Sequence, residues 1–145
     1  NLQFGDIQET ALIPLAIRAS ETKRKNHRIA DHKAVEIMDA LHVDTKPLDK
    51  YGSHEGVVDR TILLDVEVKS LIGQAPDAVC LNLGCGLDDR FSRVDNGLIQ
   101  WRNIDLEDMI AFRRKFYQDS EREMMEVRDI LSYLRLHLVK LQLVL

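Results

Sequence analysis

Residues 78–105 read AVCLNLGCGLDDRFSRVDNGLIQWRNID and contain the pattern that decides the fold. The stretch opens with an apolar run that leads into a turn containing Gly84 and Gly86. A short run that is apolar on both faces is typical of a parallel strand covered by helices. A second strand is predicted at 98–104, and Asp105 follows at its carboxyl end. The sequence therefore predicts the beginning of a parallel α/β sheet.

Three helices are predicted before this sheet. The first spans residues 7–24, where Pro14 should kink the helix or split it into two pieces. Asp31 has the side chain of an N-cap and is expected to begin the second helix. Ser53 precedes a long third helix, which should end near Gly73.

Alternating elements are predicted after the second strand. Residues 106–117 have apolar side chains at helical spacing. A helical extension is expected at 121–127 and a third strand at 127–133. The order strand, helix, strand, helix, strand indicates a doubly wound α/β sheet, with the helices of the N-terminal region placed before it.

A glycine turn followed by a carboxylate at the end of the next strand is typical of nucleotide binding. Glycines let the main chain approach a ligand closely, and the carboxylate can accept hydrogen bonds from both ribose hydroxyls. Gly84, Gly86 and Asp105 fill these positions. Asp88 stands where a third glycine would pack behind a pyrophosphate, and its charge would repel that group. A cationic sulfonium tolerates an acidic neighbour, so the pattern favours S-adenosylmethionine over NAD.

Several motifs occur in a fixed order along the chain. They are residues 5–10 (GDIQET), 31–37 (DHKAVEI), Arg60 with Thr61, 82–91 (NLGCGLDDRF), 94–97 (VDNG), Trp101 and 104–106 (IDL). Together they resemble the leucine carboxyl methyltransferase family, and within it the bacterial branch of tetracenomycin polyketide O-methyltransferases. Asp89 departs from the family, which usually has threonine there. The resemblance implies a class I methyltransferase that uses S-adenosylmethionine.

The resemblance also implies roles for five residues. Gly84 and Gly86 would line the cofactor, and Asp105 would hold its ribose. Arg60 would pair with the methionine carboxylate of the cofactor, for which a planar guanidinium is suited, and Lys23 would be a second contact to that carboxylate. No catalytic base is evident, so the methyl acceptor stays open between a carboxylate and a hydroxyl, on a small molecule or on a protein.

The same residues also have interpretations that need no ligand. Asp105 could serve only as the N-cap of the following helix. Asp88 could be a loop residue that accepts hydrogen bonds from main-chain amides. Arg60 could be a surface arginine paired with Glu55 or Asp59 on its own helix.

Composition narrows the class of function. The chain has 145 residues and a net charge of -4, with both signs of charge interspersed. Proteins that bind nucleic acids or anionic membranes present a basic field, so partners of these two kinds are not expected. No apolar stretch is long enough to cross a bilayer, and we expect a cytoplasmic protein. Histidine and cysteine do not occur at metal-ligand spacing, so no metal site is expected.

The resemblance stops after residue 133, where the family continues with further strands. We therefore expect a truncated chain in three parts: an N-terminal helical cap region (1–76), the first half of a Rossmann-like cofactor-binding sheet (77–133), and an apolar tail outside the family pattern (134–145). In a sheet of this family the first strand lies between the second and the fourth. Without a fourth strand, an open apolar edge is expected beside the glycine turn.

An open strand edge pairs readily with another segment. We expect the tail of the same chain or of a neighbour to cover the edge, which would give a homo-oligomer. The alternative to an active methyltransferase is a catalytically inactive remnant that acts only as an oligomeric structural module. A third interpretation, a fragment of an NAD-dependent oxidoreductase, is disfavoured by Asp88.

Overall fold

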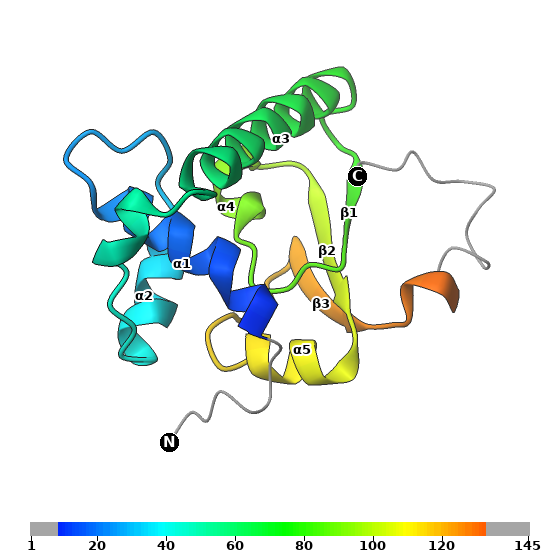
Figure 1. Cartoon of the computed structure of the whole chain (residues 1–145). Coiled ribbons are helices and arrows are strands. Elements are labelled where there is room, and N and C mark those ends of the chain that lie inside the picture. Colours follow the sequence, from blue (N-terminus) through cyan, green and yellow to red (C-terminus); the bar gives the residue numbers. More distant parts are fainter. Residues whose placement is uncertain (1–8, 133–145) are drawn as a thin grey trace. The chain divides into compact units, whose positions relative to one another are not determined.

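The computed structural model describes residues 9–132 (Figure 1). The chain divides into two compact units. Unit 1 is described over residues 9–67 and 87–90, and unit 2 over residues 68–86 and 91–132. The predicted apolar tail, and with it the expectation that the tail covers the sheet edge, lies outside the described residues.

Unit 1 is built from helices. They are α1 (Glu9–Lys23), α2 (His32–Ala40), the short 3-10 helix η2 (Lys46–Lys50) and the first part of α3 (His54–Gln74). Pro14 lies inside α1, which continues as one helix, so the predicted split is wrong. Proline removes a single hydrogen bond, to the carbonyl of Thr10. Burial of Leu15 and Ile17 directly after the proline offsets that loss.

Asp31 begins α2 as predicted. Its Oδ1 accepts a hydrogen bond from the main-chain N–H of Ala34 at 2.9 Å, which satisfies one of the free amides of the first turn. Its Oδ2 pairs with Nε of Arg18 on α1 at 2.8 Å, and Asp31 itself is 1% exposed. The N-cap therefore also ties α2 to α1.

A buried contact between an acid and a histidine lies in unit 1. Oε2 of Glu21 is 2.9 Å from Nε2 of His54, and both side chains are 1% exposed. Burial raises the pKa of Glu21, but hydrogen bonds from His54, from the Arg28 amide and from Arg24 outweigh burial and lower this pKa to about 2. Nδ1 of His54 lies 2.8 Å from the carbonyl oxygen of Leu48. The pair thus joins α1 to the start of α3.

Unit 2 contains a parallel sheet. Its elements are β1 (Val79–Leu83), most of α4 (Arg90–Val94), β2 (Gln100–Asp105), α5 (Glu107–Arg113) and β3 (Glu123–Val127). The three strands lie in the order β1-β2-β3, all parallel (Figure 1). Leu83 pairs with Ile104, and Asp105 pairs with Val127. The protein is therefore a mixed α/β chain, and the two strands predicted around the glycine turn are confirmed.

The predictions after Asp105 need correction. The helix predicted at 106–117 ends at Arg113, and a turn follows. The segment 121–127, expected to be helical, contains β3, whereas the strand predicted at 127–133 is wrong because residues 130–132 are helical. Methionine and glutamate favour helices, but pairing with β2 gives this segment hydrogen-bond partners that local preference does not reveal.

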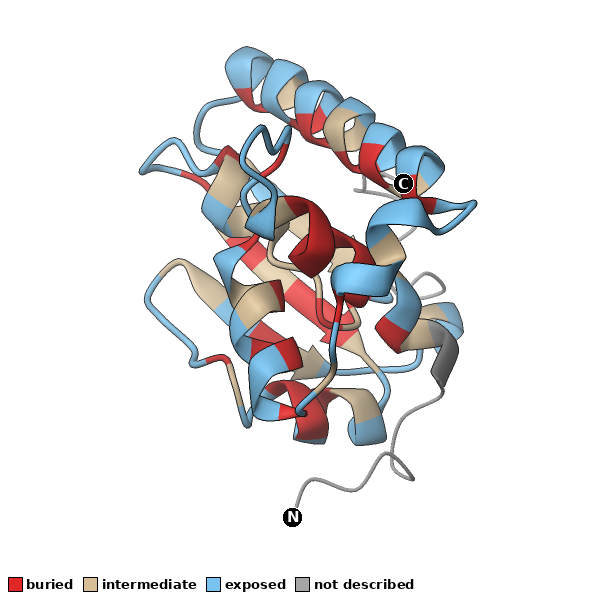
Figure 2. Cartoon of the chain, turned by 60° about the vertical axis from the view of Figure 1, so that its left-hand side comes forward, coloured by how far each residue is buried: buried red, intermediate tan, exposed pale blue. Residues whose placement is uncertain are grey.

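The core of unit 2 lies between the C-terminal part of α3 and the sheet. It contains Val68, Ile72, Val94, Ile99 and Trp101, all at most 6% exposed. The buried residues of α3 follow one side of the helix (Figure 2). Among the helices of the described chain, none combines the length and the hydrophobicity that a bilayer crossing requires.

β1 is an edge strand of the described sheet, which agrees with the expected open edge. Gly84 N donates to the Ile104 oxygen at 2.8 Å, and the Ala78 oxygen accepts from Gln100 N at 3.0 Å. Main-chain groups alternate in direction along a strand. Those of Val79 and Leu81 therefore point away from β2, where no strand pairs with them among residues 9–132.

Candidate functional site

The turn after β1 is held against the end of β2. The amides of Gly84 and Cys85 both donate to the carbonyl oxygen of Ile104, at 2.8 and 3.2 Å. Gly84 has φ +64° and Gly86 has φ +50°, a left-handed conformation that glycine adopts without steric cost. The glycines are therefore required by the path of the main chain.

Asp105 is the last residue of β2 and its carboxylate lies against the glycine turn. Oδ2 accepts a hydrogen bond from the amide of Gly86 at 2.9 Å, and Oδ1 accepts one from the amide of Leu106 at 2.8 Å. The N-cap residue of α5 is Leu106, and its side chain forms no capping hydrogen bond. The interpretation of Asp105 as only a helix N-cap is therefore wrong.

The arrangement leaves room and hydrogen-bond capacity for a ligand. A carboxylate has about four lone-pair positions, and the hydrogen bonds from Gly86 and Leu106 use two of those of Asp105. A Cβ built on Gly86 meets no atom within 4 Å, so space lies open over this residue. At Gly84 a Cβ would lie 3.6 Å from Cδ1 of Ile130. These residues fit a ligand that carries vicinal hydroxyls.

Polar side chains connect the three strands beside this turn. Nδ2 of Asn82 donates to Oδ1 of Asn103 at 3.0 Å, and Nδ2 of Asn103 donates to Oε1 of Glu123 at 2.9 Å. Nε1 of Trp101 donates to the same Asn103 oxygen at 3.0 Å. Asn103 is 1% exposed, and these three hydrogen bonds fix its amide in one orientation.

Arg113 is a residue of this region whose role the sequence did not reveal. It is fully buried, and Nη1 donates to the carbonyl oxygen of Gly86 at 3.1 Å. Helical spacing predicts that Arg113 lies on the buried side of its helix. Spacing gives no signal for the contact with Gly86, because 27 residues separate the two in the chain.

Arg60 and Lys23 belong to unit 1, whereas Gly84, Gly86 and Asp105 belong to unit 2. The side chain of Arg60 is exposed on α3. Among the described residues it forms no ion pair with Glu55 or Asp59, which pair with Arg28 at 2.6 and 3.1 Å. The ion pair between Arg60 and Glu55 or Asp59, which is the alternative interpretation of Arg60, is therefore not observed among the described residues.

Two further charged residues from the sequence have partners. Nζ of Lys23 lies 2.7 Å from Oδ1 of Asp39, and both side chains are largely exposed. Oδ2 of Asp88 lies 3.4 Å from Nη1 of Arg90. The Lys23–Asp39 pair is exposed and therefore weak, so the Lys23 ammonium remains available to exchange Asp39 for another carboxylate.

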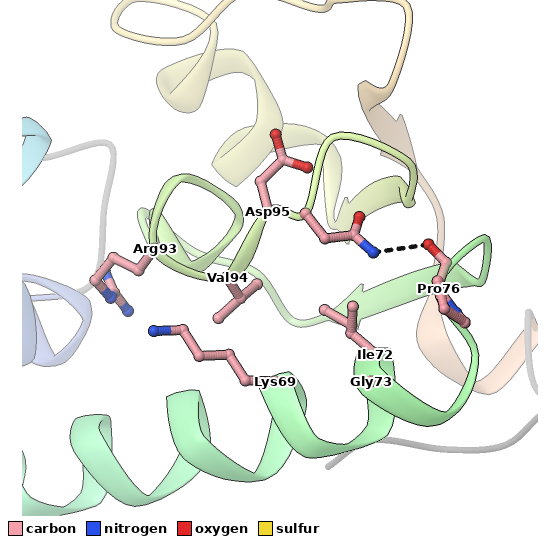
Figure 3. Close-up of a pocket in the computed structure, with 8 residues that line it drawn as sticks. Lys69, Ile72, Gly73, Pro76, Arg93, Val94 and Asp95 are labelled. Carbon is pink, nitrogen blue, oxygen red and sulfur yellow. Dashed lines mark hydrogen bonds between the residues drawn. The ribbon is translucent and has the colours of Figure 1, made fainter.

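A pocket of about 440 Å³ lies elsewhere in unit 2 (Figure 3). It is lined by the end of α3, by the end of α4 and by the residues that follow each helix, where Nδ2 of Asn96 donates to the carbonyl oxygen of Pro76. These segments precede β1 and β2, whereas ligands of parallel sheets bind where the strands end. The pocket is therefore not the predicted nucleotide site. Within residues 9–132, no three His, Cys, Asp or Glu side chains gather as metal ligands.

Comparison with known proteins identifies a distant relative of this chain. No protein-family model matches the chain. The chain is similar to the tetracenomycin polyketide synthesis O-methyltransferase TcmP of Streptomyces glaucescens, with 28% identity over 122 residues. The alignment covers 83% of this chain and 45% of TcmP, so the chain spans less than half the length of that relative. The similarity supports a methyltransferase-like relationship.

Proposed function

We propose that this chain is part of an O-methyltransferase that depends on S-adenosylmethionine. The observation that carries the proposal is the position of the Asp105 carboxylate at the end of β2. It accepts a hydrogen bond from the amide of Gly86 at 2.9 Å, and space lies open over Gly86. The similarity to TcmP supports methyl transfer as the reaction. On this proposal the sheet is the first half of a doubly wound, Rossmann-like methyltransferase fold.

Each site residue has a distinct task in this proposal. Asp105 accepts hydrogen bonds from the two ribose hydroxyls with the lone pairs that Gly86 and Leu106 leave free. Gly84 and Gly86 let the cofactor approach the main chain. Arg60 binds the methionine carboxylate through its guanidinium, and Lys23 adds a second cation.

In methyl transfer the main task of the protein is to orient the methyl donor and the acceptor. When bound, S-adenosylmethionine supplies an activated methyl group: an acceptor oxygen forms a bond to the methyl carbon while the carbon–sulfur bond breaks and its electron pair goes to sulfur. The residues of this chain fix the ribose and the carboxylate, so that donor and acceptor meet in line. A carboxylate acceptor needs no general base, whereas a hydroxyl acceptor must lose its proton.

Calorimetric titration of the chain tests the proposal directly. S-adenosylmethionine and S-adenosylhomocysteine should bind, and Asp105→Asn should weaken binding at least about tenfold, because a charged acceptor for two hydroxyls is lost. Asp108→Asn is the matched control, since Asp108 is an exposed carboxylate in the first turn of α5. Arg60→Met should weaken both ligands but leave adenosine binding unchanged, because adenosine has no carboxylate.

Two outcomes would reject this function. One is the absence of binding by either ligand to a folded chain. The other is tighter binding of NAD than of S-adenosylhomocysteine, which would favour the oxidoreductase interpretation in spite of Asp88.

A second candidate function is a non-catalytic module that self-associates. The observation that favours it is the edge of β1, where main-chain groups of Val79 and Leu81 face away from β2. Val79 is also 62% exposed. Edges of this kind recruit further strands, and a second copy of the same chain is one source of them. The two candidates are separable, because the first predicts ligand binding and the second predicts association without ligand.

A further inference from the structure

Arg113, the last residue of α5, occupies a fully buried position beneath the glycine turn. Its guanidinium carbon lies 3.8 Å from the centroid of the Tyr117 ring, so the cation stacks on an aromatic face. Nη2 lies 3.7 Å from Oε1 of Glu123 on β3, and this carboxylate supplies the opposite charge. A buried cation persists only when such partners compensate its lost hydration.

The partner of Arg113 is itself fixed. Oε1 of Glu123 accepts a hydrogen bond from Nδ2 of Asn103 at 2.9 Å, and Asn103 lies in the central strand with 1% of its surface exposed. The guanidinium is therefore held by an aromatic ring on one side and by a carboxylate anchored to the sheet on another. These two partners direct Nη1 toward the carbonyl oxygen of Gly86.

Both polar main-chain groups of Gly86 are bonded to side chains. Its N–H donates to Oδ2 of Asp105 at 2.9 Å, and its carbonyl oxygen accepts from Nη1 of Arg113 at 3.1 Å. Gly86 has φ +50°, and a Cβ built there meets no neighbour within 4 Å, so no side chain packs on that side of its Cα. The hydrogen bonds that it donates to Asp105 and accepts from Arg113 hold it in place.

We propose that Arg113 is a positioning residue of the nucleotide site, because it holds the carbonyl group of Gly86 and so fixes the main-chain conformation of this residue in which its N–H meets Asp105. The inference rests on the proposed function for its ligand. Arg113 contacts no ligand itself. It sets ligand affinity through Gly86, whose N–H occupies one face of the carboxylate and leaves the rest of Asp105 for the ribose hydroxyls.

Lysine cannot replace arginine fully in this position. The planar guanidinium stacks on Tyr117 while separate nitrogens face Gly86 and Glu123. A lysine ammonium is a single compact charge, and it cannot serve both partners while stacking as a plane. Arg113→Lys should therefore retain part of the effect, whereas Arg113→Met removes it.

The first arm of the test uses the ligand-free chain. In ¹H–¹⁵N spectra, Arg113→Met should move the amide signal of Gly86 and speed its hydrogen exchange relative to the other turn amides. Arg114→Met is the control, because Arg114 is the adjacent arginine, is 49% exposed and pairs with Asp119 on the surface. A Gly86 signal that is unchanged in a folded Arg113→Met variant overturns the inference.

The second arm measures binding of S-adenosylhomocysteine by calorimetry. Arg113→Met should weaken binding at least about tenfold and Arg113→Lys by less, whereas Arg114→Met should match the parent chain. If Arg113 acts through Asp105, then Arg113→Met should add less than about twofold in an Asp105→Asn background. Equal affinities of the parent and the folded Arg113→Met chain overturn the inference, as does full additivity of the two changes.

The two arms separate this inference from the proposed function. A parent chain that binds no S-adenosylhomocysteine rejects the function, while the Gly86 signal still decides whether Arg113 holds the turn. Where Arg113→Met does not fold, Arg113→Lys provides both measurements. The lysine of this variant keeps a positive charge opposite Glu123. If the fold needed only that charge, the variant would have the Gly86 signal and the ligand affinity of the parent chain.

Discussion

At the scale of single residues, Glu21 shows how neighbours decide the state of a buried acid. Burial alone would raise the pKa of its carboxyl, yet His54, the Arg28 amide and Arg24 lower this pKa to about 2. Each hydrogen bond favours the charged form, and together they outweigh the cost of removing it from water. Glu21 is therefore a carboxylate throughout the neutral range.

This lowered pKa gives a pH dependence of known sign. A carboxyl whose pKa falls from 4.5 to about 2 on folding stabilises the folded state fully above pH 4.5, and this contribution disappears as the pH falls toward 2. Glu21→Gln should therefore lower the free energy of unfolding at pH 7, and its difference from the parent chain should shrink between pH 4.5 and 2. Urea titrations at a series of pH values measure both quantities.

Glu36 offers the matched control for that experiment. It pairs with Lys33 at 2.7 Å on α2, and its side chain is 55% exposed, so solvent screens the pair. Glu36→Gln should leave the unfolding free energy within about 0.5 kcal/mol of the parent value at every pH. A Glu21→Gln difference that stays constant from pH 7 to pH 2 would contradict the assigned role of Glu21.

Some residues of the site could be identified from the sequence and others could not. Gly84, Gly86 and Asp105 follow from local rules, since a turn after a strand needs glycine and the end of the next strand lies beside it in a parallel sheet. Arg113 and Glu123 could not be assigned because their contacts are fixed only when α5 and β3 fold back onto the sheet.

At the scale of elements, β2 holds unit 2 together because it pairs with a strand on each side. Ile104 lies in this strand with none of its surface exposed. Ile104→Ala should lower the free energy of unfolding by about 2–5 kcal/mol, since it removes buried methyl groups and leaves a cavity. Leu106→Ala, two residues later at a position that is 59% exposed, should change it by less than about 1 kcal/mol.

Chemical denaturation followed by circular dichroism measures both variants. Similar losses at Ile104 and Leu106 would show that β2 does not lie where the structure places it. A large loss at Leu106 alone would mean that the boundary between β2 and α5 is displaced.

Elements were predictable where local signals were strong. Asp31 marks the start of α2 because a capping carboxylate works within a single turn. The strand before the glycine turn follows from its apolar run. β3 could not be predicted, because Met124 and Met125 favour a helix and only pairing with β2 makes the segment extended. Pro14 predicted a break that burial of the residues after it prevents.

At the scale of the whole molecule, the edge of β1 makes a prediction about association. The parent chain should self-associate with rising concentration in sedimentation velocity experiments. Val79→Pro should weaken this association, because proline has no main-chain N–H. The N–H of Val79 points away from β2, where it could donate to a strand of another chain. Val79→Ala, which shortens the exposed side chain and keeps the amide, should associate like the parent. A parent chain that stays monomeric at all concentrations would contradict this expectation.

The order β1-β2-β3 has a consequence for how the protein is made. Neighbours in this sheet are also successive in the chain, so each strand leaves the ribosome in time to dock beside the one before it. Among β1, β2 and β3, no strand has to insert between two earlier ones. The opposite flank of β1, by contrast, has no strand beside it among residues 9–132, so during synthesis it is a natural target for a chaperone.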